Sequence, residues 1–415
     1  MSARRDRAKQ WLMQEGNNFC ALPYIHVAIE ANGDLLPCCM GRPITDENNE
    51  KINLNNYTLE TAIKSKARQK MIESFDKNLQ YDKCNACWEN RSIHSPRINY
   101  STNIESIAFT EKAMRKENID FKLTWLEIKP GNRCNLKCRI CGTWNSSSWA
   151  DDVYNMWYQN QPYKETDLYK HMKDCNWIED PDKWKFGETL NNVETIHIMG
   201  GEPFMVPEHL NFLDNLTTKI DTSKVKLWYN TNGTFPISNE YLDVMKKFKY
   251  IVIGCSIDDI GQRMEYQRKN ANWKSVVNNI NKFYTIQKEH NNFNIIIDLT
   301  TSIFNVYYLD EIIDTMTSKN WSFPLNHHHY VDTHNSPYNI RTLRPSQKQK
   351  IKEKLITTKF SSTNLIKNVI NFMEKDLWNE EIEEIRKTNI KKLDQIRHEN
   401  FYSIFPEMAE ILEWN

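Results

Sequence analysis

The residues best suited to redox chemistry are three cysteines in one short loop. Cys134, Cys138 and Cys141 are separated by three and then by two residues, and they follow the strand-like run 123–128. Thiolates at this spacing can ligate three of the four irons of a cubane iron-sulfur cluster, which leaves the fourth iron open. A triple-cysteine loop can also form part of a zinc site, which normally takes four protein ligands. The spacing therefore favours the cluster and leaves zinc as an alternative.

A second motif follows the next predicted strand, residues 193–199. It is the tetrapeptide Gly200, Gly201, Glu202 and Pro203, with a new helix expected from Pro207. Two glycines let a backbone approach a ligand closely, and the carboxylate of Glu202 is an anionic acceptor for an ammonium group. Alone, such a turn is more often only a loop. Its position in register with the cysteine loop makes it a candidate ligand site.

Together the two motifs resemble those of the radical S-adenosylmethionine (SAM) enzymes. The cysteines match the family's CxxxCxxC signature, with Ile140 where the family usually has an aromatic residue, and the Gly-Gly-Glu-Pro turn matches the element that binds the amino group of SAM. The resemblance implies a SAM-binding 4Fe-4S cluster and reductive cleavage of SAM to a 5'-deoxyadenosyl radical that abstracts hydrogen from a substrate. It also implies an electron donor such as flavodoxin or ferredoxin.

Strands and helices continue to alternate after the second motif. We expect strands at 225–229, 250–257, 293–301 and 321–331, and helices at 239–248, 272–290 and 309–315. Counted from residue 123, these make six βα units with right-handed crossovers. The predicted fold class is α/β, a partial (β/α)6 radical SAM barrel over residues 120–335.

Polar residues follow the predicted strands where a barrel would open. The resemblance implies that Asn232 or Ser256 contacts the SAM ribose and that Arg268 meets its carboxylate, a pairing that suits a guanidinium. A bland alternative for Asn232 is an Asn-Gly turn. Residues His327 to His329 lie on the last predicted strand, where alternate side chains face opposite sides, so one or two of them are expected to line the barrel mouth.

Five other cysteines precede the barrel, and four of them form a recognisable arrangement, with Cys39 as a spare small residue beside Cys38. Cys20 and Cys38 flank a predicted hairpin that turns at 31–34, and a predicted helix from Thr58 through 75 leads to Cys84 and Cys87. The arrangement resembles the auxiliary-cluster part of SPASM and twitch domains, here over residues 17–97, although such domains usually follow the barrel. The resemblance implies a second, auxiliary 4Fe-4S cluster. A structural zinc site remains the alternative, because four thiolates suit both metals.

Composition narrows the possible partners. Lys plus Arg and Asp plus Glu number 54 each, so no overall charge directs the chain to nucleic acid. No apolar run is long enough to span a membrane, and the N-terminus lacks the apolar core of a signal peptide. We therefore expect a cytoplasmic protein without nucleic-acid or membrane partners, in which the ten cysteines serve as metal ligands more readily than as disulfides.

The substrate is the least constrained feature. Residues 345–415 are charged and helical in pattern, and their role cannot be inferred from the sequence. Because this region and the N-terminal domain add surface, we favour modification of a peptide or protein over oxidation of a small polyol or sugar. An alternative from another class is a non-catalytic iron-sulfur or zinc protein. Two independent motifs in the correct strand order argue for the enzyme.

Overall fold

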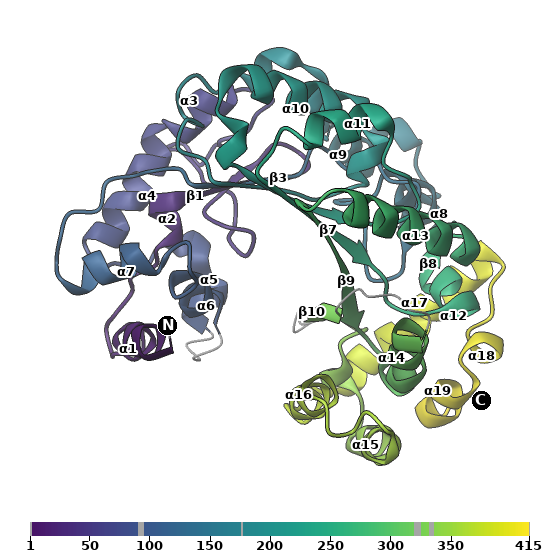
Figure 1. The fold of residues 1–415 in the computed structure, drawn as a ribbon. Helices are drawn as coiled ribbons and strands as arrows, with labels where there is room; N and C mark the ends of the chain where they lie inside the picture. The colour runs from purple at the N-terminus through teal and green to yellow at the C-terminus, as the bar shows by residue number, and fades with distance from the viewer. Residues whose placement is uncertain (1, 90–94, 176, 319–324, 332–335, 415) are drawn as a thin grey trace. The chain divides into compact units, whose positions relative to one another are not determined.

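The structure, a computed structural model, describes residues 2–89, 95–175, 177–318, 325–331 and 336–414 (Figure 1). It divides into two units that are described separately below. The first unit combines residues 1–133, 170–229 and 238–251, and the second combines residues 134–169, 230–237 and 252–415.

The first unit is built on a sheet with the strand order β6-β5-β3-β1-β2. Its strands are β1 (His26–Ile29), β2 (Leu35–Leu36), β3 (Trp125–Ile128), β5 (Thr195–Ile198) and β6 (Lys226–Thr231). Strands β1, β3, β5 and β6 run parallel, and β2 returns antiparallel to β1. Strand β5 is buried along its whole length, as expected of a parallel strand covered on both faces. The hairpin that carries Cys38 therefore joins the sheet of the first barrel strands.

The helices expected from Pro207 and over residues 239–248 are present in the first unit with altered ends, whereas the short helices at 22–25 and 85–89 were not predicted. The helices of this unit are α1 (Ser2–Leu12), α2 (Leu22–Ile25), α3 (Leu59–Ile63), α4 (Lys66–Asp76), α5 (Asn85–Glu89), α6 (Pro96–Ser101), α7 (Ile107–Met114), α10 (Pro207–Lys219) and α11 (Asn239–Met245). The single helix expected over residues 58–75 is two helices, because Ser65 caps α4 by accepting a hydrogen bond from the amide of Arg68. Thr58 caps α3 as predicted. Helices α10 and α11 pack against each other (Figure 1).

The second unit holds strands β7 (Tyr250–Ser256), β9 (Phe293–Thr301) and β10 (Leu325–Tyr330) in the order β10-β9-β7. Between them lie α12 (Gly261–Gln267), α13 (Trp273–Glu289) and α14 (Leu309–Ser318), and α8 (Ala150–Trp157) follows the cysteine loop. A separate two-stranded ribbon pairs β4 (Lys137–Cys138) with β8 (Arg268–Lys269) in antiparallel register. This ribbon, which the sequence did not predict, places Arg268 opposite Cys138.

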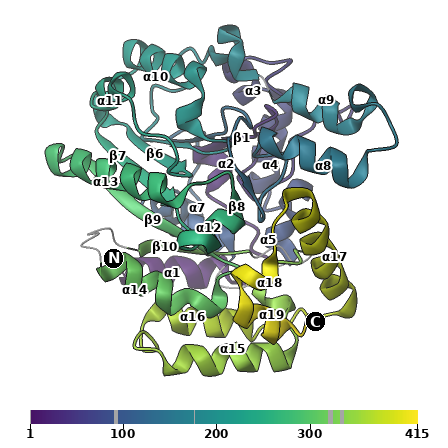
Figure 2. The same ribbon diagram turned by 90° about the vertical axis from the view of Figure 1, so that its right-hand side faces the viewer.

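The C-terminal region is helical, as predicted. Its helices are α15 (Pro345–Thr357), α16 (Asn364–Met373), α17 (Glu380–Arg397), α18 (Phe401–Ile404) and α19 (Pro406–Leu412). Asn379 caps α17, and three glutamates in its first turn suit the positive end of the helix dipole. Helix α17 contacts α8, and α18 contacts α12 (Figure 2).

The α/β class, the parallel strands and the helical C-terminal region are thus confirmed. Among the described residues, no helix has the length and apolar character needed to cross a membrane.

Candidate functional sites

The loop of Cys134, Cys138 and Cys141 is held in place by hydrogen bonds to its backbone. The Trp149 indole nitrogen donates to the carbonyl of Cys138 over 3.0 Å, and the hydroxyl of Ser148 donates to the carbonyl of Cys134 over 2.7 Å. The β4–β8 pairing holds the middle of the loop. The loop is therefore fixed by its own unit, which suits a ligand set that must keep one geometry.

Nitrogen donors surround the thiols of this loop. The amide of Leu136 and Nδ2 of Asn232 lie 3.5 and 3.6 Å from Sγ of Cys134, and Nη1 of Arg268 lies 3.8 Å from Sγ of Cys138. Burial raises the pKa of Cys141 to about 12, so its thiolate needs nearby positive charge. Hydrogen bonds to cluster sulfurs are one means by which proteins set the potential of a bound cluster. Three thiols supplied with donors fit a cubane with one open iron.

The other residues predicted to contact SAM are ordered by the protein itself. Asp258 accepts two hydrogen bonds from the Arg268 guanidinium, over 2.6 and 2.9 Å, so this arginine already has a carboxylate partner. Asn232 donates to Oδ1 of Asn135 over 3.0 Å as well as to Cys134. Ser256 is the half-buried last residue of β7. Arg268 and Asn232 are thus brought to the cysteine loop.

The Gly-Gly-Glu-Pro turn packs against the residue that directly precedes Cys134. The amide of Glu202 donates to the carbonyl of Arg133 over 2.7 Å. A Cβ at Gly201 would lie 2.3 Å from the same oxygen, and Gly201 has φ +58°. Only glycine fits such a contact. The Glu202 side chain is fully buried and accepts a hydrogen bond from the amide of Phe204 over 3.3 Å.

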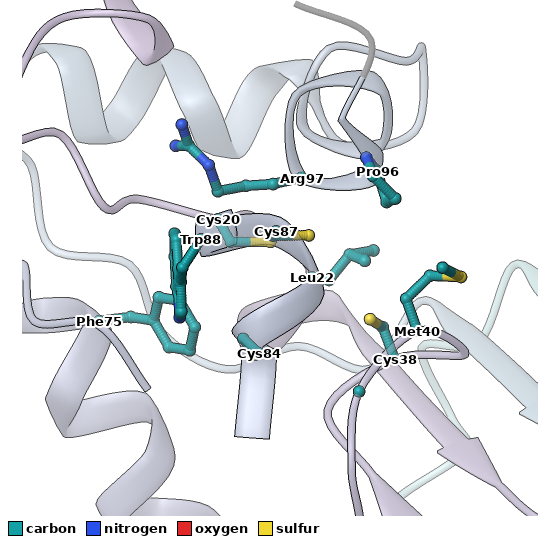
Figure 3. A pocket seen from close by; sticks show the side chains of 11 residues that line it. Cys20, Leu22, Cys38, Met40, Phe75, Cys84, Cys87, Trp88, Pro96 and Arg97 are labelled. Carbon is teal, nitrogen blue, oxygen red and sulfur yellow. The ribbon is translucent and has the colours of Figure 1, made fainter. Parts of the chain in front are cut away.

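The four cysteines of the N-terminal segment line a single pocket (Figure 3). The structure thus brings together Cys20, Cys38, Cys84 and Cys87, which come from separate stretches of the chain. Apolar side chains, among them Leu22, Phe75 and Trp88, make up most of the remaining wall, and the cation Arg97 also lines it. Cys39 does not line the pocket, and its Sγ lies 3.8 Å from the hydroxyl of Tyr100. The structure therefore places Cys38, the predicted ligand, in the pocket and the adjacent Cys39 outside it.

Burial disfavours the ionised form of the thiols in this pocket, so a bound metal would be needed to hold them as thiolates. Burial raises the pKa of Cys20 to about 11 and that of Cys38 well above its usual value. Four thiols in one pocket can ligate a 4Fe-4S cluster or a tetrahedral zinc ion, so the donor set fits a metal centre of either kind.

Sequence reasoning missed a buried carboxyl in the second unit. Asp298 on β9 accepts a hydrogen bond from Nδ2 of Asn230 over 2.9 Å, and its Oδ1 is buried with no hydrogen-bond partner among the described residues. A Cβ at Gly254 would lie 2.1 Å from its Oδ2, so the glycine makes room for this carboxyl. Burial raises the pKa of Asp298 to about 7. The available signal was a glycine inside a strand, which often marks a close approach.

A second missed cluster lies on neighbouring strands of the first unit. Oε2 of Glu127 on β3 is 3.7 Å from Nε2 of His26 and 3.9 Å from Nδ1 of His197. Burial acts to raise the pKa of Glu127, but the two histidines and Lys129 bring it below its usual value. The carboxylate is therefore ionised inside the sheet. A glutamate within an otherwise apolar strand was the signal for it.

The structure describes only part of the run of three histidines, His327 to His329. Their backbone belongs to β10, where His329 is opposite Thr300 of β9, and the His329 side chain is exposed. The side chains of His327 and His328 lie outside the described residues. Their expected role at the barrel mouth therefore stays a prediction.

Comparisons with known proteins identify two domains in this chain. Residues 128–301 match the family model of the radical SAM superfamily, and residues 20–88 match the SPASM model, described as an iron-sulfur cluster-binding domain. A search of curated proteins gives no match. The chain thus has a radical SAM domain preceded by a SPASM domain. Together these domains imply 4Fe-4S clusters and SAM as cofactors.

Solved structures give distant likenesses. One is anSMEcpe with bound AdoMet, at 16% identity and a TM-score of 0.35, which covers 60% of each chain. Another is anSMEcpe with AdoMet and the Cp18Cys peptide, at 15% identity and a TM-score of 0.33, with 56% of this chain and 58% of that chain covered. Streptococcus suis SuiB bound to its precursor peptide SuiA has 13% identity and a TM-score of 0.32, with 94% and 75% covered. The chain spans about three-fifths of the length of the anSMEcpe chains.

Proposed function

We propose that this radical SAM enzyme modifies a side chain or the backbone of a peptide or protein. Cys134, Cys138 and Cys141 would hold the SAM-binding cluster, and Cys20, Cys38, Cys84 and Cys87 the auxiliary one. When bound, the reduced cluster and SAM supply a 5'-deoxyadenosyl radical that abstracts hydrogen from the substrate.

The observation that carries this proposal is the hydrogen bond from the Glu202 amide to the carbonyl of Arg133. It ties the Gly-Gly-Glu-Pro turn to the residue next to Cys134 in the chain. Gly200, Gly201, Glu202 and Pro203 would bind the amino group of SAM. In that role the turn presents polar backbone and the anionic Glu202 to an ammonium group.

The remaining assignments follow the same proposal. Asn232 and Ser256 would face the SAM ribose, and Arg268 would offer its carboxylate a cation while Asp258 keeps the guanidinium oriented. A flavodoxin or ferredoxin would supply the electron, and the cytoplasm would keep the ten free thiols reduced. The working division is 17–97 for the auxiliary domain, 120–335 for the barrel and 345–415 for the helical region.

A peptide is favoured over a small polyol because the SPASM domain and five C-terminal helices add surface that a small substrate does not need.

The test uses anaerobically reconstituted protein with dithionite and SAM. Two cubanes predict about eight irons per chain, and 5'-deoxyadenosine should form. Short peptides encoded beside the gene are then added, and mass spectrometry should show hydrogen loss or gain in one of them. If only a small polyol raises 5'-deoxyadenosine formation, the substrate class is wrong. Iron near zero would instead favour a non-catalytic protein.

A further inference from the structure

Arg139, which lies between Cys138 and Ile140, is buried and bound to the C-terminal region. Its Nη2 donates to Oδ1 of Asp394 over 2.5 Å and to Oε2 of Glu399 over 2.6 Å. Its guanidinium carbon lies 3.7 Å from the centre of the Tyr266 ring. Only 2% of Arg139 is exposed, so both ion pairs are shielded from water.

A second set of contacts ties the same loop to the end of α17. Asp152 accepts from Nζ of Lys137 over 2.9 Å and from Nε of Arg397 over 2.8 Å. The Arg397 guanidinium lies over the ring of Trp149, whose indole nitrogen donates to the carbonyl of Cys138. Two cations of the cysteine loop, at positions 137 and 139, are therefore linked to residues 394–399.

The backbone at the end of α17 and the hydrogen bonds of Asp394 favour these contacts. His398 has φ +52°, a left-handed conformation that ends α17 and turns the chain so that Glu399 also reaches Arg139. Asp394 accepts from the Tyr266 hydroxyl over 2.8 Å and from the amide of Phe401 over 2.7 Å, so its carboxylate is fixed before it meets Arg139. Burying charged groups is costly unless they are paired and hydrogen-bonded.

Helix α17 carries another buried arginine, Arg386, whose contacts stay within the C-terminal half of the chain. Arg386 donates to the carbonyl of Pro337 over 2.7 Å and to the carbonyl and hydroxyl of Thr342, and these contacts lie outside the cysteine loop. Arg386 is thus a buried cation that takes part in the packing of the C-terminal region alone. The carboxylates at Asp394 and Glu399 face the loop instead.

We propose that residues 394–399 form a clamp that positions the cysteine loop and sets the charge beside its cluster. Asp394, Glu399 and Arg397 are positioning residues in this clamp, with Arg139 and Lys137 as their anchors in the loop. The inference rests on the proposed function, since it assumes that Cys134, Cys138 and Cys141 hold a cluster. It assigns a role to a C-terminal region whose sequence gave none.

The test measures the reduction potential of the cluster whose electron paramagnetic resonance (EPR) signal changes when SAM is added, in full-length reconstituted protein. Asp394→Asn and Glu399→Gln each remove a negative charge and should move the potential upward. Arg139→Gln removes a positive charge and should move it downward. Arg386→Gln, the control on the same helix, should leave it unchanged. The clamp would be overturned if the potential moved in the same direction in the Asp394, Glu399 and Arg139 variants. It would also be overturned if their shifts equalled that of Arg386→Gln.

Arg139→Lys separates charge from position. It keeps the cation but loses the two-carboxylate geometry, so the potential should stay near that of the wild type while a chelator strips iron from this cluster several-fold faster. A stripping rate equal to that of the wild type would contradict the positioning role. If the wild-type protein shows no SAM-sensitive signal, the proposed function fails. If that signal is present and the variants behave as Arg386→Gln does, only the clamp fails.

Discussion

The two cysteine sites use different means to hold buried thiols. In the loop of Cys134, Cys138 and Cys141, side chains supply the donors, with Asn232 and Arg268 beside the sulfurs. In the pocket of Cys20, Cys38, Cys84 and Cys87, much of the wall is apolar, and backbone amides such as that of Leu22 act on the thiols. The first site has three thiols beside the cation Arg268, which is paired with Asp258. The second has four thiols in a mostly apolar wall that includes one cation, Arg97.

This difference matches two tasks. A three-thiol site with nearby cations suits a cluster that must bind an anionic carboxylate and take an electron. A four-thiol pocket walled by Phe75 and Trp88 suits a cluster that is fully ligated and shielded from water. The comparison therefore predicts that loss of a thiol has different consequences in the two sites.

The largest effect is expected from Cys138→Ala. With two thiols left in the loop, the SAM-binding cluster should not assemble, and 5'-deoxyadenosine should fall to the level of a reaction without enzyme. Iron should drop by about half, from about eight to about four per chain, because the auxiliary cluster stays. Chromatography of 5'-deoxyadenosine and iron analysis check both values. Wild-type product formation by this variant would contradict the assignment.

Cys84→Ala should give the complementary result. Iron should again fall by about half, while 5'-deoxyadenosine formed without substrate should persist and modified peptide should be lost. Cys39→Ala is the matched control, because Cys39 is next to Cys38 but outside the pocket. It should retain all the iron. Equal iron loss in the Cys39 variant would show that the two adjacent cysteines exchange as ligands.

The parts of both sites that could be predicted from the sequence are those whose residues lie close together in the chain. The cysteine spacing, the Gly-Gly-Glu-Pro turn and the hairpin before Cys38 each lie within a few residues, where backbone geometry limits the choices. The pairing of Arg139 with Asp394 spans 255 residues, and no pattern in either segment points to the other. Pairing of β1 with β3 was missed for the same reason, because the short strand 26–29 carries no mark of its partner.

Gly201→Ala tests the turn that accompanies the three-thiol site. A Cβ there would press on the carbonyl of Arg133, and φ +58° adds a cost of about 1–2 kcal/mol for a residue with a side chain. Binding of SAM should weaken by about tenfold or more, with iron content unchanged, as equilibrium binding of SAM will show.

Gly261→Ala is the control for that variant. Gly261 has nearly the same φ, +56°, but no atom lies within 4 Å of the position that a Cβ would take, so it carries the backbone cost without the clash. SAM binding should change little. Equal losses in the two variants would mean that backbone strain alone explains the effect and that the contact with Arg133 is incidental.

The last prediction concerns stability and not cluster chemistry, and it depends on Asp298, a buried carboxyl of a kind that the residues lining the auxiliary pocket lack. The folded pKa of Asp298, about 7, is above its ordinary value of 3.8. The folded chain therefore holds a proton that the unfolded chain releases between about pH 4 and pH 7, and stability falls as pH rises through this range. The full cost, up to about 4 kcal/mol, is present above pH 7 and absent below pH 4.

Asp298→Asn keeps an oxygen for Asn230 and removes the titration. Relative to the wild type, this variant should gain thermal stability as the pH is raised from 5 to 8, measured as the midpoint of unfolding at each pH. Asp214→Asn is the control, because its exposed carboxylate lies 3.5 Å from Lys247 at the surface and should give a difference that is flat over the same range. A flat difference for Asp298→Asn as well would show that this carboxyl does not titrate between pH 5 and pH 8, which would contradict its raised pKa.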